Sequence, residues 1–322
     1  MQETSMEAIS RPPAWKVWLA FCIIYFVWGS TFLAIRVGVR EVPPLLLAGM
    51  RFFVAGIILY AWMRAKGEAS PTGREWGAAT LLAFLIFVVD YGCLFWAERR
   101  VPSGIAAVMM ATIPAFMAVS EILILRTQRP TPRLAFALLL GLGGVAVLMS
   151  RSLSLDGAPI DTAGACALIV GAISWSVASA LTRKLRLPVS KVMSSGAQML
   201  AGGVLLILAA AIFGEFHGFR IEAVSRGAWF ALAYLIVAGS IIGFTAYVWL
   251  IHHESPTKVG TYAYVNPVVA VLVGYFLGGE ALGTRTILGT LLVLVSVVVI
   301  TTTRGKKPDL SLSEEAQPIA EA

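Results

Sequence analysis

Two ionisable residues inside long apolar stretches, Arg51 and Asp90, are the first candidates for chemistry in this chain. Arg51 lies about eight residues, or ~12 Å of helix rise, from the outer end of its stretch, and Asp90 lies a similar distance from the outer end of its own. A charged side chain costs several kcal/mol in hydrocarbon unless it is paired or hydrated. We therefore expect both to face one interior cavity and to be partnered, directly or through water or a ligand. The alternative is that Arg51 extends to the surface and Asp90 caps a neighbouring backbone.

Aromatic and amide side chains at middle depth could complete a binding site. Trp28 and Trp175 lie well inside their stretches, and a buried indole N–H needs an acceptor. A polar cavity would supply one, although helix packing alone also explains both tryptophans. Tyr262 and Tyr264 point to different helix faces, so at most one should line the cavity. The candidate binding residues are Trp28, Arg51, Asp90, Tyr91, Trp175, Gln198, Tyr264 and Asn266.

Two prolines, Pro114 and Pro267, lie in the middle of apolar stretches. There the missing N–H and the ring clash kink a helix and free backbone carbonyls. Such kinks suit gating elements, and a purely structural kink fits the sequence equally well.

The elements that carry these residues are long and apolar. The chain is 58% hydrophobic and 13% charged, about half the ~25% charge of soluble domains. About 20 apolar residues cross the hydrocarbon core as a helix, and unpaired backbone is not tolerated there. The chain is therefore predicted to be an all-α polytopic membrane protein. Its ten predicted transmembrane helices cover approximately residues 16–37, 43–63, 75–97, 102–125, 131–149, 160–182, 190–214, 225–251, 256–278 and 283–303.

A duplicated pattern divides these helices into two groups of five. Pro102-Ser103 and Ile113-Pro114 in the first copy are echoed by Pro256-Thr257 and Asn266-Pro267 in the second. Because five is odd, the second group starts on the opposite side, so the repeats are inverted, with sites expected between them near the midplane. The predicted regions are 1–15 (N-terminal segment), 16–149 (first repeat), 150–159 (linker), 160–303 (second repeat) and 304–322 (disordered tail).

Lysine and arginine in the loops orient the helices. With the N-terminus inside, the inner loops carry about twice as many of these residues as the outer loops. Every lysine falls on the inner side. Both termini are therefore predicted to be cytoplasmic.

Several motifs resemble, in order and spacing, the two tandem modules of the EamA family in the drug/metabolite transporter superfamily. They are Trp28-Gly29-Ser30-Thr31-Phe32, Pro43-Pro44 followed by Arg51-Phe52, Val101-Pro102-Ser103-Gly104, Asn266-Pro267 and Leu277-Gly278-Gly279-Glu280-Ala281-Leu282. The resemblance covers roughly residues 16–302. It implies a ten-helix, inverted-repeat carrier in the bacterial inner membrane, usually exporting amino acids or other small metabolites. This chain departs from the pattern in having Gln128 where the second copy has Glu280. That difference weakens any role that needs a carboxylate at both positions.

Several other functions find no support in the sequence. No G-x-x-x-x-G-K-[ST] loop is present for ATP hydrolysis. The three histidines lie in loops, so neither a metal site nor a Ser/His pair is expected inside the membrane, and an enzyme is not predicted. The basic residues form short clusters between apolar stretches rather than one patch for nucleic acid. No cofactor is expected.

The sequence favours a secondary transporter that moves a small metabolite by alternating access. A carboxyl group in a dry cavity can hold a proton near neutral pH, so proton coupling through Asp90 is one option. Uniport and exchange fit as well. The alternatives are a membrane sensor or scaffold, and an exchanger of nucleotide-sugar type. Phosphates usually need several cations, and Arg51 stands alone at depth, which disfavours the exchanger. Substrate identity and oligomeric state are not predicted.

Overall fold

The computed structural model describes residues 12–126, 131–149, 161–182, 184–253 and 262–301, and these form helices with no β-strand. Seven helical stretches in this part are long and apolar enough to cross a membrane: Ala14–Val39, Pro44–Ala65, Gly73–Glu98, Ser103–Leu125, Thr162–Thr182, Lys191–Ile212 and Arg226–Tyr247. Shorter apolar helices cover Pro132–Gly144, Val265–Gly278 and Thr284–Ser296. The predicted all-α membrane class is thus confirmed for the described residues. The ten-helix arrangement stays a prediction.

In the first half of the chain, several membrane-length stretches consist of α-helix interrupted by π-helical segments, here labelled η. The elements are α1 (Ala14–Cys22), η1 (Ile23–Val27), α2 (Trp28–Val39), α3 (Pro44–Ala65), α4 (Gly73–Ala83), η2 (Phe84–Tyr91), α5 (Gly92–Glu98), α6 (Ser103–Met110), α7 (Ile113–Ser120), η3 (Glu121–Leu125) and α8 (Pro132–Met149).

The second half has the same kind of interruption in the stretch that begins at Arg226. Its elements are α9 (Thr162–Thr182), α10 (Lys191–Ile212), the 3₁₀-helix η5 (Ile221–Ala223), α11 (Arg226–Tyr234), the π-helical η6 (Leu235–Ile242), α12 (Gly243–His253), α14 (Tyr262–Gly278) and α15 (Thr284–Thr301). A π-helical turn carries an extra residue and breaks the regular bonding ladder, so its carbonyls become available to other partners.

Helix starts follow from the residues at their first turns. α3 begins at Pro44, where a missing N–H costs nothing and the fixed φ suits a helix. α4 begins with a capping box, in which the Thr72 side chain accepts from Glu75 N and the Glu75 carboxylate accepts from Thr72 N. Ser225 caps α11 in the same position, accepting from Ala228 N.

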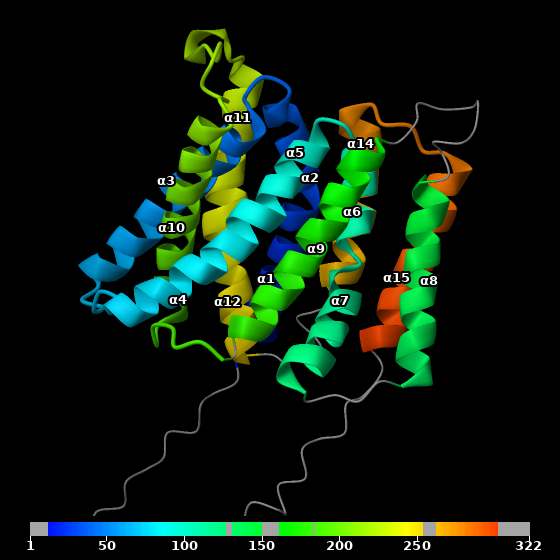
Figure 1. Ribbon diagram of the computed structural model, residues 1–322, viewed down its shortest axis with the longest axis horizontal. Coiled ribbons are helices and arrows are strands. Elements are labelled where there is room, and N and C mark those ends of the chain that lie inside the picture. The colour runs from blue at the N-terminus through cyan, green and yellow to red at the C-terminus, as the bar shows by residue number, and fades with distance from the viewer. Residues whose placement is uncertain (1–11, 127–130, 150–160, 183, 254–261, 302–322) are drawn as a thin grey trace, which may run out of the picture.

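Glycines allow the two halves to approach closely along α3 and α10. A Cβ added at Gly203 would lie 2.3 Å from the backbone nitrogen of Phe53, and one at Gly56 would lie 2.4 Å from that of Leu200. The two helices therefore pack backbone against backbone. α8 and α15 form a second such pair at the side of the bundle (Figure 1), with Gly144 against Val293.

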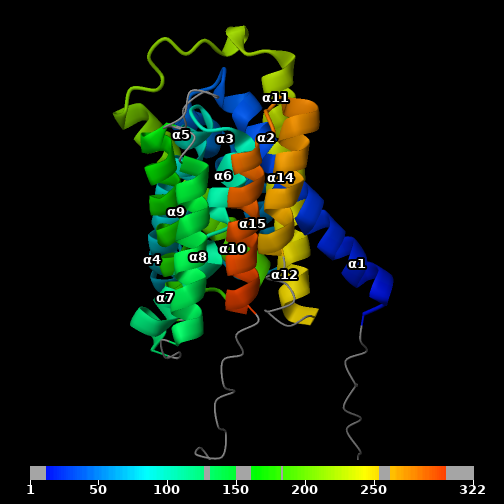
Figure 2. The same cartoon turned by 90° about the vertical axis from the view of Figure 1, so that its right-hand side faces the viewer.

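The described ends of the chain lie at one end of the bundle. α1 begins and α15 finishes at the lower end in Figure 2, where α1 also tilts away from the other helices. The C-terminal ends of α2, α5 and α14 lie toward the opposite end, as does the start of α6 (Figures 1 and 2). The polar cluster described below lies at that opposite end.

The two predicted kink prolines occupy different backbone contexts. Pro114 is the second residue of α7, just after the helix is interrupted between Met110 and Ile113. Its side chain lies outside the described ones. Pro267 lies within the continuous helix α14. A gating role for either residue remains a prediction.

Candidate functional site

Arg51 is buried in the middle of α3, with 3% of its surface exposed. Its Nε donates to the Ser240 hydroxyl in η6 at 3.0 Å. The guanidinium lies over the rings of Phe52 and Tyr91, 4.7 and 5.5 Å from their centroids. Its Nη1 is buried without a hydrogen-bond partner. The structure thus presents a buried cation that is held in place by a hydroxyl and two rings and forms no ion pair with any described carboxylate.

Asp90 in η2 is equally buried, with 2% exposed, and its Oδ1 has no hydrogen-bond partner. It lies against α9, where a Cβ added at Gly171 would come within 2.9 Å of that oxygen. Asp90 and Arg51 form no direct ion pair, and the link between them is Tyr91, which follows Asp90 in the chain and stacks under Arg51. Pairing through a ligand or water stays a prediction.

An aromatic group surrounds Trp28, which begins α2. Its ring centroid is 5.3 Å from those of both Tyr247 and Tyr262, and its indole N–H donates to Gly239 O at 3.0 Å. Gly239 is part of η6, directly before Ser240. The indole therefore has the partner that the sequence required of it, and the partner is a helix carbonyl.

Trp175 in α9 belongs to a second aromatic group. Its ring meets Tyr91 edge-on at 6.2 Å, and Tyr91 in turn contacts Phe52 and Phe87. Tyr91 thus joins this group to the buried guanidinium of Arg51. The structure thus brings together three of the candidate binding residues, Trp175, Tyr91 and Arg51.

The amide candidates are engaged differently. Gln198 donates to Ser194 Oγ one turn earlier in α10, at 3.0 Å. Asn266 in α14 is buried and its Oδ1 lacks a partner. The side chain of Tyr264 lies outside the described ones. Tyr247 and Tyr262, which contact Trp28, are not among the predicted binding residues. Tyr262 entered the sequence analysis only as the alternative to Tyr264, and the register of the duplicated prolines places no tyrosine of the first copy opposite Tyr247.

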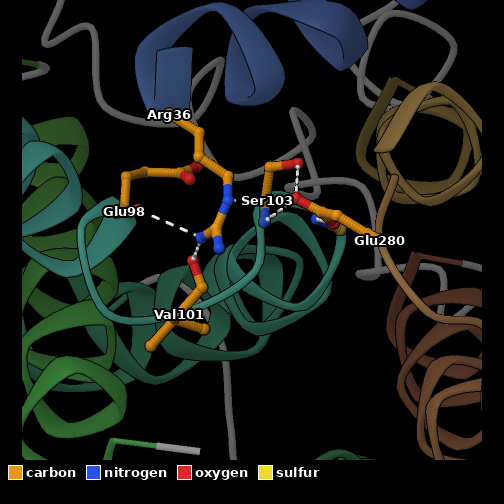
Figure 3. Close-up of polar contacts among 6 residues, drawn as sticks. Arg36, Glu98, Val101, Ser103 and Glu280 are labelled. Atoms are coloured by element: carbon orange, nitrogen blue, oxygen red, sulfur yellow. Dashed lines mark hydrogen bonds and ion pairs between the residues drawn. The ribbon is translucent and has the colours of Figure 1, made fainter. Parts of the chain in front are cut away.

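A second polar cluster joins four parts of the chain at one end of the bundle (Figure 3). Glu280, in the turn after α14, accepts from Ser103 N at 2.8 Å, Ser103 Oγ at 2.6 Å and Gly104 N at 3.1 Å. It therefore caps the start of α6 with a negative charge, where the helix dipole favours one. Gly279 precedes it with φ +63°, a conformation that glycine adopts without strain.

Arg36 on α2 ties this cap to α5. Its Nε lies 3.4 Å from Glu280 Oε1, and its Nη1 donates to the backbone oxygens of Glu98 and Val101. The Glu98 side chain is 0% exposed, and neither of its carboxylate oxygens has a hydrogen-bond partner. The sequence alone places these charges in loops and at helix ends. Their meeting depends on tertiary packing, although Ser103 and Glu280 both lie in motifs that carry the family resemblance.

Two more glutamates at this end cap helices that are distant in the chain. Glu41, after α2, accepts from Ser225 N and Ser225 Oγ at the start of α11, at 2.6 and 2.7 Å. Glu215, after α10, accepts from Leu46 N in α3 at 2.9 Å. Hydrogen bonds donated to Glu41 by Ser225 lower the pKa of that carboxyl. Glutamate caps between distant helices therefore hold this end together.

Comparisons with known proteins agree with this geometry. The EamA-like transporter family matches residues 15–150 and 162–302. "Uncharacterized inner membrane transporter YedA" of Escherichia coli K12 is 39% identical over 285 residues, which cover 88% of this chain and 89% of YedA. "Uncharacterized transporter YoaV" of Bacillus subtilis is 23% identical over a region that covers 91% of this chain and 99% of YoaV.

One solved crystal structure is 23% identical in sequence, and its alignment covers 89% of this chain and 96% of the solved chain with a TM-score of 0.60. At this level of identity it supports the fold alone. The family match spans most of the chain, and the identity to YedA is well above the level of chance similarity. The resemblance noted in the sequence is thereby confirmed. The chain belongs to the EamA-like transporter family.

Proposed function

We propose that this membrane transporter is a secondary carrier of the inner membrane that exports a small, amino-acid-like or other organic solute by alternating access. The observation that carries the proposal is the buried Arg51 guanidinium, which has no carboxylate partner among the described residues. An intramembrane charge is costly and is kept where it serves a ligand or ion path. Arg51 would bind an anionic group of the solute, and Tyr91, Trp175 and Trp28 would form the wall around its apolar part.

The proposed architecture is ten helices in two inverted repeats. Three parallels between the halves support it. The π-helical segments η2 and η6 interrupt corresponding stretches, each after a capped helix that starts at Gly73 or Arg226. Each π-helical segment accepts a side-chain hydrogen bond from the other half: Trp28 Nε1 to Gly239 O, and Ser174 Oγ to Leu85 O. The family matches the chain twice, over residues 15–150 and 162–302.

The polar cluster of Arg36, Glu98, Ser103 and Glu280 would lie on the periplasmic side. The lysine and arginine bias of the loops supports this orientation, with both termini cytoplasmic. The glutamate caps of Glu41, Glu215 and Glu280 would then close the periplasmic end in this structure. Export would require these contacts to open.

Asp90 is the residue of the central region that could carry a coupled proton, because it is buried without a cationic partner. If it does so, Asp90→Asn would transport without dependence on a pH gradient that the parent requires. A variant with unchanged dependence would remove Asp90 from this role.

A ligand-stabilisation screen on the purified protein tests the proposed solute class. Amino acids, organic acids, polyamines and nucleotide sugars are compared by the shift that each causes in the thermal midpoint. A ligand at 100 times its Kd stabilises by about 2.7 kcal/mol. We expect solutes with a carboxylate to stabilise the parent and Arg40→Gln, an exposed control, but not Arg51→Gln. Equal stabilisation of Arg51→Gln would refute the assigned site, and a response to nucleotide sugars alone would favour the exchanger.

A further inference from the structure

One carboxyl group in the polar cluster at the end of the bundle has no role in the proposed transport path. Glu98, the last residue of α5, has 0% of its surface exposed, and neither side-chain oxygen accepts a hydrogen bond. The Arg36 guanidinium reaches the backbone oxygen of Glu98, not its carboxyl group (Figure 3). A buried carboxylate without a donor would bear the cost of desolvation with no hydrogen bond to offset it.

The contacts around Glu98 show which of the two glutamates pairs with Arg36. Glu280 receives three hydrogen bonds from Ser103 and Gly104 and lies within ion-pair distance of Arg36. It is therefore the carboxylate that balances the guanidinium. Glu98 is left as a second carboxyl group beside a cation that is already neutralised.

Other charged groups do not change this assignment. Arg36 and Glu280 are the charged side chains that lie beside Glu98 in the cluster (Figure 3). α6 and α9, which pack against α5, carry no charged residue, and Arg51 and Asp90 lie deeper in α3 and η2. Of the two arginines that follow Glu98, Arg99 is exposed, and Arg100 is stacked on Trp96 at 3.8 Å and paired with Asp161.

We propose that Glu98 is a protonation site of the carrier, occupied by a proton when this end is closed and empty when it is open. The inference rests on the proposed alternating access. The cluster joins α2, α5, α6 and the turn after α14, so the end cannot open without separating some of these residues and admitting water. A hydrated glutamate is ionised near neutral pH. Opening therefore releases a proton from Glu98, and closing takes one up.

A lower pH on the side to which this end opens should therefore favour the closed state. One proton bound in the closed state and absent in the open state changes the open-to-closed ratio by up to about tenfold per pH unit. Glu98 exchanges this proton with the side of the membrane to which this end opens, so the proton shifts the equilibrium between the open and closed states. It is distinct from any proton carried across the membrane at Asp90.

Infrared spectroscopy of the purified protein tests the protonation without any transport assay. The carbonyl stretch of a protonated carboxyl group separates from carboxylate bands. The difference spectrum between the parent and Glu98→Gln, near neutral pH, should contain that band. The matched control Glu222→Gln, an exposed glutamate at the same end, should leave it in place. If Glu98→Gln is not recovered folded, Glu98→Asp should shift the band. A band unchanged by any Glu98 variant, or absent in the parent, overturns the proposal.

Spin-label distances test the link to opening. Labels at Arg40→Cys and Thr284→Cys, both exposed, are placed in a background in which Cys22, Cys93 and Cys166 are replaced. The open population of the parent and of Glu222→Gln should rise with pH, whereas that of Glu98→Gln should not respond. A parent that does not respond to pH, or a Glu98→Gln variant that responds as the parent does, refutes the link. Neither measurement needs a substrate, so both outcomes hold whether or not solute transport is found.

Discussion

The Nε of Arg51 in α3 donates to the Oγ of Ser240 in η6 at 3.0 Å, and this bond positions the buried cation of the central site. Ser240 directly follows Gly239, whose carbonyl accepts the indole N–H of Trp28. One π-helical segment thus orients two of the predicted binding residues. Their relationship makes the irregular backbone of η6 part of the site.

Replacing Ser240 with alanine should leave the Arg51 Nε buried without an acceptor. The loss of a buried partner costs about 1–3 kcal/mol, so we expect a lower thermal midpoint and weaker ligand stabilisation. Ser179→Ala is the control, since the Ser179 hydroxyl donates to Trp175 O one turn earlier in its own helix. Equal midpoints for the two variants would show that Ser240 does not support Arg51.

Gly203→Ala should disrupt the packing of α10 on α3. The added methyl group would lie 2.3 Å from the backbone nitrogen of Phe53, so one of the helices must shift. Overpacking of this kind costs about 1–3 kcal/mol. Gly77→Ala, where a Cβ meets no atom within 4 Å, should gain about 0.5–1 kcal/mol from helix propensity. Thermal unfolding in detergent measures both, and a Gly203→Ala variant as stable as the parent would contradict the backbone contact between the two helices.

Glu280→Gln should weaken the closed end of the bundle. An amide keeps the size of the side chain but loses the charge-assisted bonds to Ser103, Gly104 and Arg36, which are roughly twice as strong as neutral ones. We expect faster maleimide labelling of a cysteine at buried position Ile105, in a background without other cysteines. Labelling no faster than in the parent background would mean that Glu280 does not hold this end closed.

The cap formed by Glu41 should make the stability of the protein depend on pH. Its pKa is lowered because Ser225 donates two hydrogen bonds to the carboxylate. The stability that it contributes is therefore present above the pKa of the unfolded chain and is lost as pH falls through the lowered pKa. The thermal midpoint of Glu41→Gln should lie below that of the parent at neutral pH and converge with it in acid. A constant difference at every pH would exclude this linkage.

The sequence predicted the all-helical membrane class and, through residue depth, placed Arg51 and Asp90 at one level. The long apolar stretches and the cost of intramembrane charge were sufficient for this. The π-helical segments could not be predicted, because one extra residue does not interrupt an apolar run. Nor could the end cluster, since Ser103 and Glu280 are 177 residues apart and meet only through helix packing. Arg51 and Asp90 are predicted to be partnered directly or through water or a ligand. The structure shows no direct ion pair between these two residues and gives Arg51 the Ser240 hydroxyl as a hydrogen-bond partner.

Solute counterflow in proteoliposomes tests the central claim most directly. Vesicles are loaded with the solute that stabilises the purified protein best, and the same solute, isotopically labelled, is added outside. A carrier that alternates access exchanges the two, so the label should accumulate transiently above its equilibrium level with the parent and with Arg40→Gln. It should not accumulate with Arg51→Gln. If the parent binds the solute but accumulates no more label than protein-free vesicles, the protein is a sensor rather than a carrier.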